Sequence, residues 1–311
     1  MSPTKVTIVG GYGGVGSALA YTLLTSADPC EVTLLGRRSP YVACQLMDLG
    51  GVTPFGDTAV RSGDIDDFAD SDVVVITASV PFEPLASRLD FLSRNIEVLR
   101  PYFRALAELP ADWSGHVIVV TNPVDPLTTW LGHAARIDRH QLLGYSWNDS
   151  LRLRIAVGQA LGAHASDVVG WVVGEHGDGC VPLFDRIRVG GVPVRLSPEQ
   201  QRSVSAEIRG WYARWAALGV ARTTAWTTAA GVARMIHDLA SRALSDWCAA
   251  VPLHGEYDID GVAIGVPITI GSNHVSPVHE WQLAQHDGYA LHHAADVIRR
   301  HAYQCDDALA L

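Results

Sequence analysis

Gly11-Tyr12-Gly13-Gly14-Val15-Gly16 is the stretch that decides the fold. It follows the β-branched run Val6-Thr7-Ile8-Val9-Gly10, which predicts a short buried strand, and it precedes residues 17–25, which predict a helix. A G-x-G-x-x-G pattern between a strand and a helix is typical of a turn that binds a dinucleotide. We expect Gly11 to permit the tight turn, Gly13 to let backbone approach a pyrophosphate, and Gly16 to let the helix pack on the strand. The helix N-terminus would offer free N–H groups to the phosphates, and the alternative is a turn that is merely glycine-rich.

Composition limits the kinds of partner. The chain has 311 residues, of which 48% are hydrophobic and 18% charged, so it can fold as two modest domains with real cores. Its net charge of -10 disfavours nucleic acid and anionic membranes, but a few local arginines would suffice for a small anionic substrate. The 5 cysteines are scattered and lack the spacing of metal ligands, which favours a reducing compartment and predicts no metal site. No apolar run approaches the ~18 residues that would span a bilayer, so we expect a cytoplasmic protein.

The second strand predicts which cofactor is preferred. Residues 31–35 run into Gly36-Arg37-Arg38-Ser39, where an NAD site usually has an acid that bonds the ribose 2′-hydroxyl. Arginines at this place can bind a 2′-phosphate through charge-assisted bonds, and an acid would repel it. We therefore expect NADP, with NAD as the alternative cofactor and a solvated basic turn as the alternative interpretation.

Strands and helices alternate through the first half of the chain. Further strands are predicted at residues 59–61, 72–78, 117–120 and 142–144, with helices at 41–49 and 87–109. Strands that are apolar throughout and alternate with helices imply a parallel sheet covered on both faces. Because ligands bind outside the carboxyl ends of such strands, Gly11, Ser79 and Asn122 become candidates for the site.

The ionisable residues of the second half lie at the start of a predicted helix and just after a predicted strand. Asp149 and Arg152 are three residues apart near the start of a helix over 148–161, so they can share one face. Gly174-Glu175-His176-Gly177-Asp178 follows the apolar run 168–173, which predicts a rigid buried strand, and places an imidazole for proton transfer. The alternatives are an acid that stabilises the helix dipole beside a surface arginine, and a turn histidine bonded to a carbonyl.

Other segments of the second half predict secondary structure only. We expect a hairpin over 182–194 with its turn at Gly190-Gly191, one or two long helices within 198–247, and a terminal helix over 281–303. Antiparallel strands are expected over 253–270, with Pro267 suited to an edge. Tryptophans on the long helices are compatible with a subunit interface or with core packing.

Taken together, these motifs resemble the lactate/malate dehydrogenase family over nearly the whole chain. The matching motifs, in the family order, are Gly11–Gly16, Met47-Asp48-Leu49, Thr121-Asn122-Pro123-Val124-Asp125, Asp149-Ser150-Leu151-Arg152-Leu153-Arg154 and Gly174–Asp178. The resemblance implies an α/β fold, with a Rossmann-type doubly wound parallel sheet over residues 1–147 and an α+β substrate domain over 148–311. It also implies reduction of a small 2-oxo acid to an L-2-hydroxy acid by a nicotinamide cofactor, and a homodimer or homotetramer.

The resemblance also implies individual roles. His176 would give and take the proton, Asp149 would orient it and stabilise the imidazolium, and Arg88 would polarise the carbonyl. Arg152 would bind the substrate carboxylate through two parallel bonds, and Asn122, with a cis bond to Pro123, would contact nicotinamide ribose and substrate. Thr224 would lie at the floor of the substrate pocket. The cofactor-binding residues would be Gly11, Gly13, Gly14, Val15, Gly16, Gly36, Arg37, Arg38, Ser39, Ala78 and Asn122.

The sequence departs from the family pattern six residues before Arg88. The family has arginine there in malate enzymes and glutamine in lactate enzymes, but this chain has Phe82. An aromatic ring would leave the second carboxylate of oxaloacetate unpaired, and Glu83 would repel it. We therefore expect a substrate with an apolar or aromatic side chain, the alternative being that Phe82 only packs the closed loop.

Three other functions stay open. One is malate or lactate dehydrogenase proper. Another is a non-catalytic NADP-binding protein of the same fold, against which the complete set of Arg88, Asp149, Arg152 and His176 argues. The third is an NAD-dependent glycosidase with a metal held by Cys and His, for which Cys180 near His176 is the only pointer.

Overall fold

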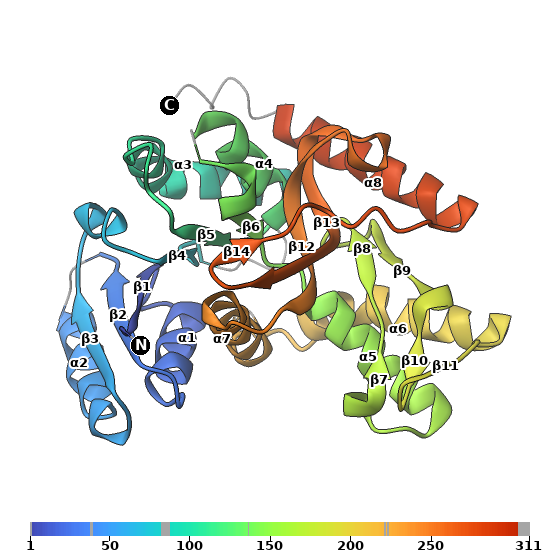
Figure 1. Cartoon of the computed structure of the whole chain (residues 1–311), viewed down its shortest axis with the longest axis horizontal. Helices are drawn as coiled ribbons and strands as arrows, with labels where there is room; N and C mark the ends of the chain where they lie inside the picture. Colours follow the sequence, from blue (N-terminus) through green and yellow to red (C-terminus); the bar gives the residue numbers. More distant parts are fainter. Residues whose placement is uncertain are drawn as a thin grey trace.

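Six parallel strands form the sheet of the first half of the molecule (Figure 1). The structure is a computed structural model, and it describes residues 2–37, 40–81, 88–135, 137–220, 222 and 224–303, without the side chains of 88–90. The spatial order of the six strands is β3-β2-β1-β4-β5-β6, with every neighbouring pair parallel. This is the strand order of doubly wound dinucleotide-binding sheets. The strands are β1 (Thr4–Val9), β2 (Cys30–Leu35), β3 (Thr58–Ser62), β4 (Val73–Ile76), β5 (His116–Val119) and β6 (Leu142–Gly144).

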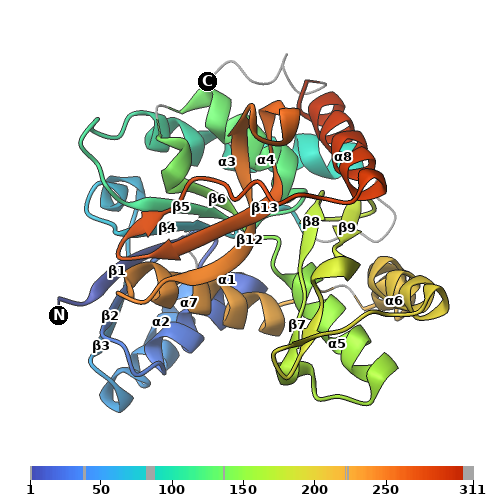
Figure 2. The ribbon, with the colours of Figure 1, turned by 45° about the vertical axis from the view of Figure 1, so that its right-hand side comes forward.

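Helices cover both faces of this sheet because its strands are apolar on both sides. In β4, Val73 and Val75 pack with α1 and α7, whereas Val74 and Ile76 pack with α3 and α4. The helix α7 lies along α1, so a segment of the second half helps to cover the first (Figure 2). The helices involved are α1 (Gly14–Leu24), α2 (Pro40–Gly50), α3 (Arg88–Ala107), α4 (Val124–Ala134) and α7 (Trp226–Ala240).

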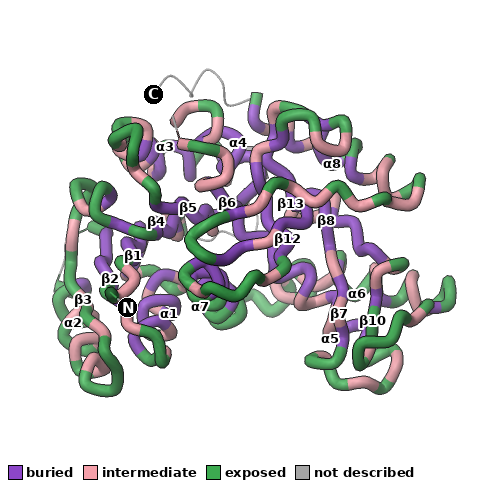
Figure 3. The backbone as a smooth tube through the Cα atoms, viewed as in Figure 1, coloured by how far each residue is buried: buried purple, intermediate pink, exposed green. Residues whose placement is uncertain are grey.

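The sheet continues into the second half through antiparallel strands. From β6 onward the order is β12-β13-β8-β9, and a separate three-stranded sheet has the order β11-β10-β7. The buried residues of these central strands run through the middle of the molecule (Figure 3). The strands are β7 (Val168–Val169), β8 (Val172–Gly174), β9 (Cys180–Pro182), β10 (Arg188–Val189), β11 (Val192–Pro193), β12 (Ser245–His254), β13 (Asp260–Gly271) and β14 (His274–Val275).

The remaining helices lie outside this sheet. The long ones are α5 (Asn148–Leu161), α6 (Pro198–Ala217) and α8 (Gln285–Tyr303), and α5 packs against α6. Single 3-10 turns occur at Thr53–Phe55, Ile65–Phe68, Arg139–Gln141, Ala165–Asp167, Phe184–Arg186 and Glu256–Asp258. None of the helices within the described ranges is long and apolar enough to cross a membrane.

The structure confirms the α/β class and most predicted elements, including the hairpin whose turn is Gly190-Gly191, with φ of +56° and +78°. The division into domains at 147/148 stays a prediction, because one sheet passes from β6 into β12 across that division.

Several predicted elements were wrong in part. The run 168–173 is not one strand: β7 pairs with β10, β8 pairs with β13 and β9, and Gly170-Trp171 separates them. Trp247 belongs to β12 rather than to a helix, and α8 begins at Gln285 instead of residue 281. Pro267 lies in a strand with neighbours on both sides, β12 and β8, rather than in an edge strand, but the side opposite β12 is unpaired at Pro267 itself. Its missing N–H is tolerated because β8 pairs at Gly265 and β14 only from Ile270 onward.

Candidate active site

The glycine-rich turn begins one residue earlier than the sequence suggested. Gly10, not Gly11, has the left-handed backbone, with φ of +80°, and a Cβ added to it would meet the backbone of Ala78, just after β4, at 2.5 Å. A side chain on Gly16 would come within 3.0 Å of the backbone of Gly10 and Gly11, so this glycine does bring the helix against the strand end. Gly11 is the second residue of the turn that the Gly13 N–H closes on the Gly10 carbonyl, and a side chain there would collide with Leu34, so the turn needs glycine at both positions.

The start of α1 leaves backbone groups available. Gly13 is the N-cap residue and has no side chain to cap the helix, and α1 begins at Gly14, whose Cβ position is open space. The first N–H groups of a helix have no partner within it, and here they face a turn of glycines without side chains. This arrangement fits the pyrophosphate of a dinucleotide, because N–H groups and a positive dipole end bind anions.

The end of β2 carries the predicted cofactor-selecting residues. Gly36 lies under the ring of Tyr12, since an added Cβ would meet the ring edge at 2.7 Å. Arg37 is exposed and has no ion-pair partner in the part of the chain that the structure describes. Arg38 and Ser39 lie outside the described residues. An acidic side chain at residue 36 would thus require Tyr12 to move, a constraint that the sequence pattern did not reveal.

The ends of β4 and β5 are tied together by hydrogen bonds. The Thr121 hydroxyl donates to the carbonyl of Ala78 at 2.8 Å, and the buried side chain of Asn95 on α3 bonds both strand ends. Asn95 Nδ2 donates to the Asn122 carbonyl at 2.7 Å, and the Val80 backbone N–H donates to Asn95 Oδ1 at 2.8 Å. The peptide bond from Asn122 to Pro123 is cis. Asn122 itself is exposed at the end of β5.

Three of the four predicted ionisable residues meet at the carboxyl ends of β5 and β6. His176 Nδ1 lies 2.6 Å from Asp149 Oδ2, and Arg152 Nη1 donates to Asp149 Oδ1 at 2.8 Å. An ionised carboxylate can only accept, so Nδ1 carries the proton of this bond and Nε2 is the nitrogen left for a substrate. The side chains are 15%, 7% and 19% exposed for His176, Asp149 and Arg152. We call these three residues, together with Asp125, the His176 cluster.

The pKa values in this cluster are set by burial and by neighbouring charges. Burial lowers the pKa of His176, but the charge and hydrogen bond of Asp149 raise it, and the net effect is a raised pKa. Burial raises the pKa of Asp149, yet the imidazolium and the Arg152 guanidinium outweigh it, so that the Asp149 pKa is lowered. The pair is therefore suited to hold an imidazolium beside a carboxylate around neutral pH.

Asp125 belongs to the same cluster, although no role for it was predicted from the sequence. It lies in the first turn of α4, is 1% exposed, and its Oδ2 accepts the backbone N–H of His176 at 2.7 Å. Only its place in the motif Thr121–Asp125 pointed to it. Nothing local in the sequence shows that α4 would bring this acid against a turn 51 residues further along.

Arg152 is held on a second side by an aromatic ring. Its Cζ lies 4.1 Å from the centre of the Trp211 ring on α6, and Trp211 stacks on Trp215 with 5.3 Å between ring centres. A guanidinium over an indole face gains a cation–π interaction and is fixed in orientation. An apolar surface therefore adjoins the predicted carboxylate-binding group, and α6 contributes it.

Thr224 precedes α7 and is linked to the cluster through one chain of hydrogen bonds. Its carbonyl accepts from the Thr228 hydroxyl at 3.2 Å, and Asn148 Nδ2 donates to that hydroxyl at 2.9 Å. Asn148 is the neighbour of Asp149 and in turn accepts from Tyr145 at 3.0 Å. The predicted pocket floor is thus fixed to the same helix that carries Asp149 and Arg152.

Two predicted residues cannot be placed in this site. Phe82 lies outside the described residues, and Arg88 is described only as the first residue of α3, without its side chain. The roles given to them stay predictions.

Cys180 does not behave as a nucleophile. It is buried, and burial raises its pKa to about 12, so that the thiol stays protonated. Among the described residues no group of three or more His, Cys, Asp or Glu side chains could hold a metal ion.

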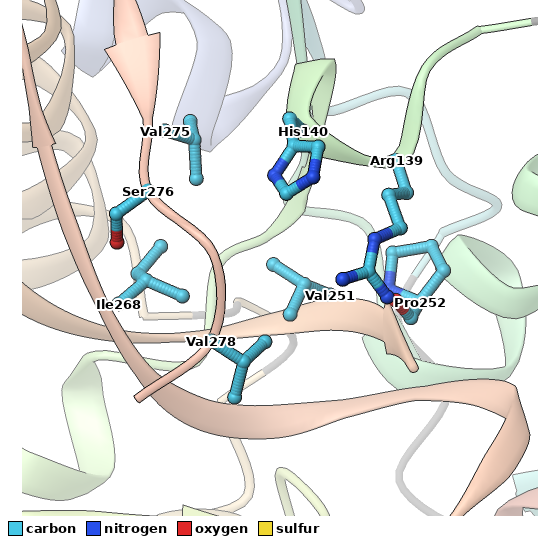
Figure 4. Close-up of a pocket in the computed structure, with 8 residues that line it drawn as sticks. All are labelled: Arg139, His140, Val251, Pro252, Ile268, Val275, Ser276 and Val278. Atoms are coloured by element: carbon cyan, nitrogen blue, oxygen red, sulfur yellow. Dashed lines mark hydrogen bonds between the residues drawn. The ribbon is translucent and has the colours of Figure 1, made fainter. Parts of the chain in front are cut away.

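A separate hollow lies at the opposite end of β6. Figure 4 shows the side chains of Val251, Ile268 and Val278 beside Arg139 and His140, which come before β6 in the chain. Asp149 follows the carboxyl end of the same strand, so this hollow is distinct from the His176 cluster.

Comparison with known proteins identifies the class. The family model described as lactate/malate dehydrogenase, NAD binding domain, matches residues 4–144, and the model of the alpha/beta C-terminal domain matches residues 148–305. The chain is 33% identical over 300 residues to malate dehydrogenase of Halobacterium salinarum, covering 94% of this chain and 96% of that protein. It is 34% identical over 286 residues to L-lactate dehydrogenase of Lactobacillus delbrueckii subsp. bulgaricus, covering 90% and 92%.

Solved structures agree in fold. The minor L-lactate dehydrogenase from Enterococcus mundtii superposes with a TM-score of 0.87 at 22% identity, covering 98% of this chain and 99% of that one. The malate dehydrogenase from Aeropyrum pernix gives 0.86 at 24% identity, with 96% and 97% covered.

The fold and the site define a nicotinamide-dependent oxidoreductase built on a Rossmann domain. The chain belongs to the lactate/malate dehydrogenase family, whose enzymes act on small 2-hydroxy and 2-oxo acids.

Proposed function

We propose that this enzyme reduces a 2-oxo acid with an apolar or aromatic side chain to the L-2-hydroxy acid, and that it prefers NADPH. The observation that carries the proposal is the His176 cluster, in which one carboxylate orients an imidazole and a guanidinium from the same helix. A proton donor beside a carboxylate-binding group is what a 2-oxo acid requires, because its carbonyl and its carboxylate are adjacent.

In the proposed reaction, His176 Nε2 donates its proton to the substrate carbonyl oxygen and takes it back in the reverse direction. Asp149 accepts the proton-bearing Nδ1 as a hydrogen-bond donor, so that Nε2 faces the substrate, and its charge stabilises the imidazolium. Arg152 binds the carboxylate with the N–H groups not engaged by Asp149, and Arg88 polarises the carbonyl. Thr224 forms the pocket floor. The reduced nicotinamide supplies the hydride when the cofactor is bound.

The residues around the glycine turn would hold the cofactor. Gly11, Gly13, Gly14, Val15 and Gly16 would face the pyrophosphate, with Ala78 and Asn122 at the adjacent strand ends. Gly36, Arg37, Arg38 and Ser39 would bind the 2′-phosphate, a role supported by the exposed guanidinium of Arg37 and by Tyr12, whose ring takes the space an acid at 36 would need.

The cofactor preference is tested by kcat/KM for NADPH and NADH in the wild type and in Arg37→Ala. Loss of one charge-assisted bond worth ~1.5–3 kcal/mol would lower kcat/KM for NADPH by roughly tenfold to a hundredfold. NADH, which lacks the 2′-phosphate, would be affected little. A wild type that favours NADH contradicts the NADPH part of the proposal and leaves the rest intact.

Two aromatic residues support the apolar substrate. Phe82 replaces the arginine that malate enzymes would use, and the Trp211 ring lies against the guanidinium proposed to hold the carboxylate. A second substrate carboxylate next to these rings would be desolvated without a partner.

A panel of 2-oxo acids tests this part of the proposal. We expect phenylpyruvate and 2-oxoisocaproate to be reduced with higher kcat/KM than oxaloacetate, and Phe82→Arg to reverse the order. Faster reduction of oxaloacetate by the wild type would instead favour malate dehydrogenase, the activity in the name of the Halobacterium salinarum relative. The same panel separates an enzyme from a non-catalytic NADP-binding protein, which would turn over none of these acids.

Two further proposals concern the whole protein. We infer a cytoplasmic homodimer or homotetramer, which sedimentation of the purified protein would test. The exposed Trp226, at the start of α7, is a residue that a subunit contact would cover.

A further inference from the structure

Asp125 has one oxygen that is used and one that is not. Oδ2 accepts the backbone N–H of His176, whereas Oδ1 is buried and has no hydrogen-bond partner within the described part of the chain. Leaving a carboxylate oxygen buried without a partner is costly, so a purely structural hydrogen bond would be better served by a neutral side chain. A buried carboxylate with one unpaired oxygen therefore indicates that the negative charge of Asp125 has a function of its own.

Charged groups from three segments face one another here. Asp125 from α4, Asp149 and Arg152 from α5 act on His176, and Glu175 and Asp149 act on Asp125. Two acids, Asp125 and Asp149, therefore act on one imidazole, and Glu175 adds a further negative charge that acts on Asp125.

Asp125 changes its own charge in the range where an imidazole works. Burial raises the pKa of Asp125 to about 7, against the lowering effect of the His176 charge and backbone N–H. In the opposite direction, the charge of Asp125 is one of the causes that raise the pKa of His176. The Asp125 carboxylate and the His176 imidazolium thus favour each other's ionised form. The hydrogen bond from the His176 backbone N–H to Asp125 keeps the two residues in contact.

We propose that Asp125 is a positioning residue with two functions: it anchors the backbone of His176, and its negative charge favours the protonated imidazole. The inference rests on the proposed function of His176 as the proton donor. Asp149 orients the ring from one side, and Asp125 acts from the backbone side of the same residue.

The substitution Asp125→Asn separates the two functions, since a carboxamide oxygen still accepts the backbone N–H but carries no charge. In the direction of 2-oxo acid reduction, the alkaline limb of kcat/KM against pH reports loss of the His176 proton in the free enzyme. Removing a negative charge that favours the imidazolium moves this limb to lower pH by about 0.5–1 unit. This shift is smaller than the 1–3 units expected for a charge in direct contact with the ring.

Asp125→Ala removes the anchor as well, so kcat falls at every pH in addition to the shift. A matched control is Asp238→Asn, because Asp238 is a buried acid that bonds Arg234 and Trp247 instead of His176. That variant can lose stability but leaves the limb in place. An unshifted limb in Asp125→Asn overturns the charge function.

A titration without substrate keeps this inference distinct from the proposed function. The imidazole signals of His176, assigned by comparison with His176→Asn, are followed by NMR in the wild type and in Asp125→Asn. A lower midpoint in the variant supports the inference even if no 2-oxo acid is turned over, and equal midpoints overturn it. Should Asp125→Asn fail to fold, the carboxyl carbon of Asp125 in the wild type must titrate in two coupled steps with His176; a single independent step overturns the inference.

Discussion

The glycine turn and the His176 cluster lie at the carboxyl ends of strands in one sheet, but they are built in opposite ways. The turn spans residues 10–16 and depends on glycines, which have no side chain, since a Cβ on Gly16 would collide with the backbone. The cluster depends on side chains that are present and buried, brought from α4, α5 and the turn after β8. One region is a property of seven consecutive residues, and the other is a property of the folded chain.

This difference predicts how each region fails. A substitution in the turn disturbs backbone packing and therefore changes stability and cofactor binding together. A substitution of His176, Asp149 or Arg152 removes a proton donor or a charge and leaves the backbone in place, so it changes turnover first. Three measurements test this separation, and a fourth concerns an ion pair outside both regions.

His176→Asn should have the largest effect. Loss of the proton donor should lower kcat by roughly 10²–10⁴-fold, because general acid catalysis contributes about that much. The dissociation constant for cofactor should remain that of the wild type, since the glycine turn is untouched. Retained turnover would show that another group donates the proton.

Arg152→Lys should come next. Lysine keeps the charge but not the two parallel N–H groups, nor the flat face that lies on Trp211. We expect KM for the 2-oxo acid to rise by roughly tenfold to a hundredfold, equivalent to ~1.4–2.8 kcal/mol. Trp211→Phe serves as the control, because a smaller ring keeps the face and should change KM far less.

The pair Gly16→Ala and Gly14→Ala tests the turn. At Gly16 the added methyl meets backbone at less than 3.0 Å, so stability should fall by roughly 1–3 kcal/mol and the melting temperature with it. At Gly14 nothing lies within 4 Å, so the same methyl should leave stability unchanged and weaken cofactor binding only. Equal melting temperatures for both variants would contradict the close approach of Gly16 to Gly10.

Glu256→Gln should have the smallest effect and lies outside both regions. Glu256 pairs with Arg139 beside the hollow of Figure 4, and this hydrogen bond lowers the Glu256 pKa to about 2. A lowered pKa stabilises the fold above the unfolded value near 4.5, and this stability is lost as the pH falls towards 2. Because the pair is partly solvated, we expect about 1 kcal/mol or less at pH 7, shrinking between pH 4.5 and pH 2 in urea unfolding. A difference that persists at pH 2 would require another cause.

The sequence predicted correctly those features of the fold and the site that depend on local residue pattern. Alternating apolar strands and helices were enough for the doubly wound sheet, and the interval between Asp149 and Arg152 was enough for their shared helix face. Residues 168–173 misled because an apolar run does not reveal that its two halves pair with different sheets. Pairing partners such as β10 and β13 come from elsewhere in the chain, and no local pattern records them.

The parts of the site that were missed have the same cause. Gly10 and Gly11 are both glycines, and only the backbone shows which one has positive φ. Asp125, Trp211 and Asn95 act on residues distant in sequence, through α4, α6 and α3. Their chemistry is ordinary when each is seen alone, so tertiary packing is what makes them part of the site.

Asn95 adds a second link between two strand ends that the Thr121 hydroxyl already joins. A single amide fixes the peptide at Val80, where the chain leaves β4, and the carbonyl of Asn122, where it leaves β5. Because the amide is wholly buried, neither end can shift by more than a hydrogen bond allows without displacing the other. The end of β4 and the contact predicted for the nicotinamide ribose at Asn122 are therefore coupled through one side chain, and a rearrangement at one is transmitted to the other.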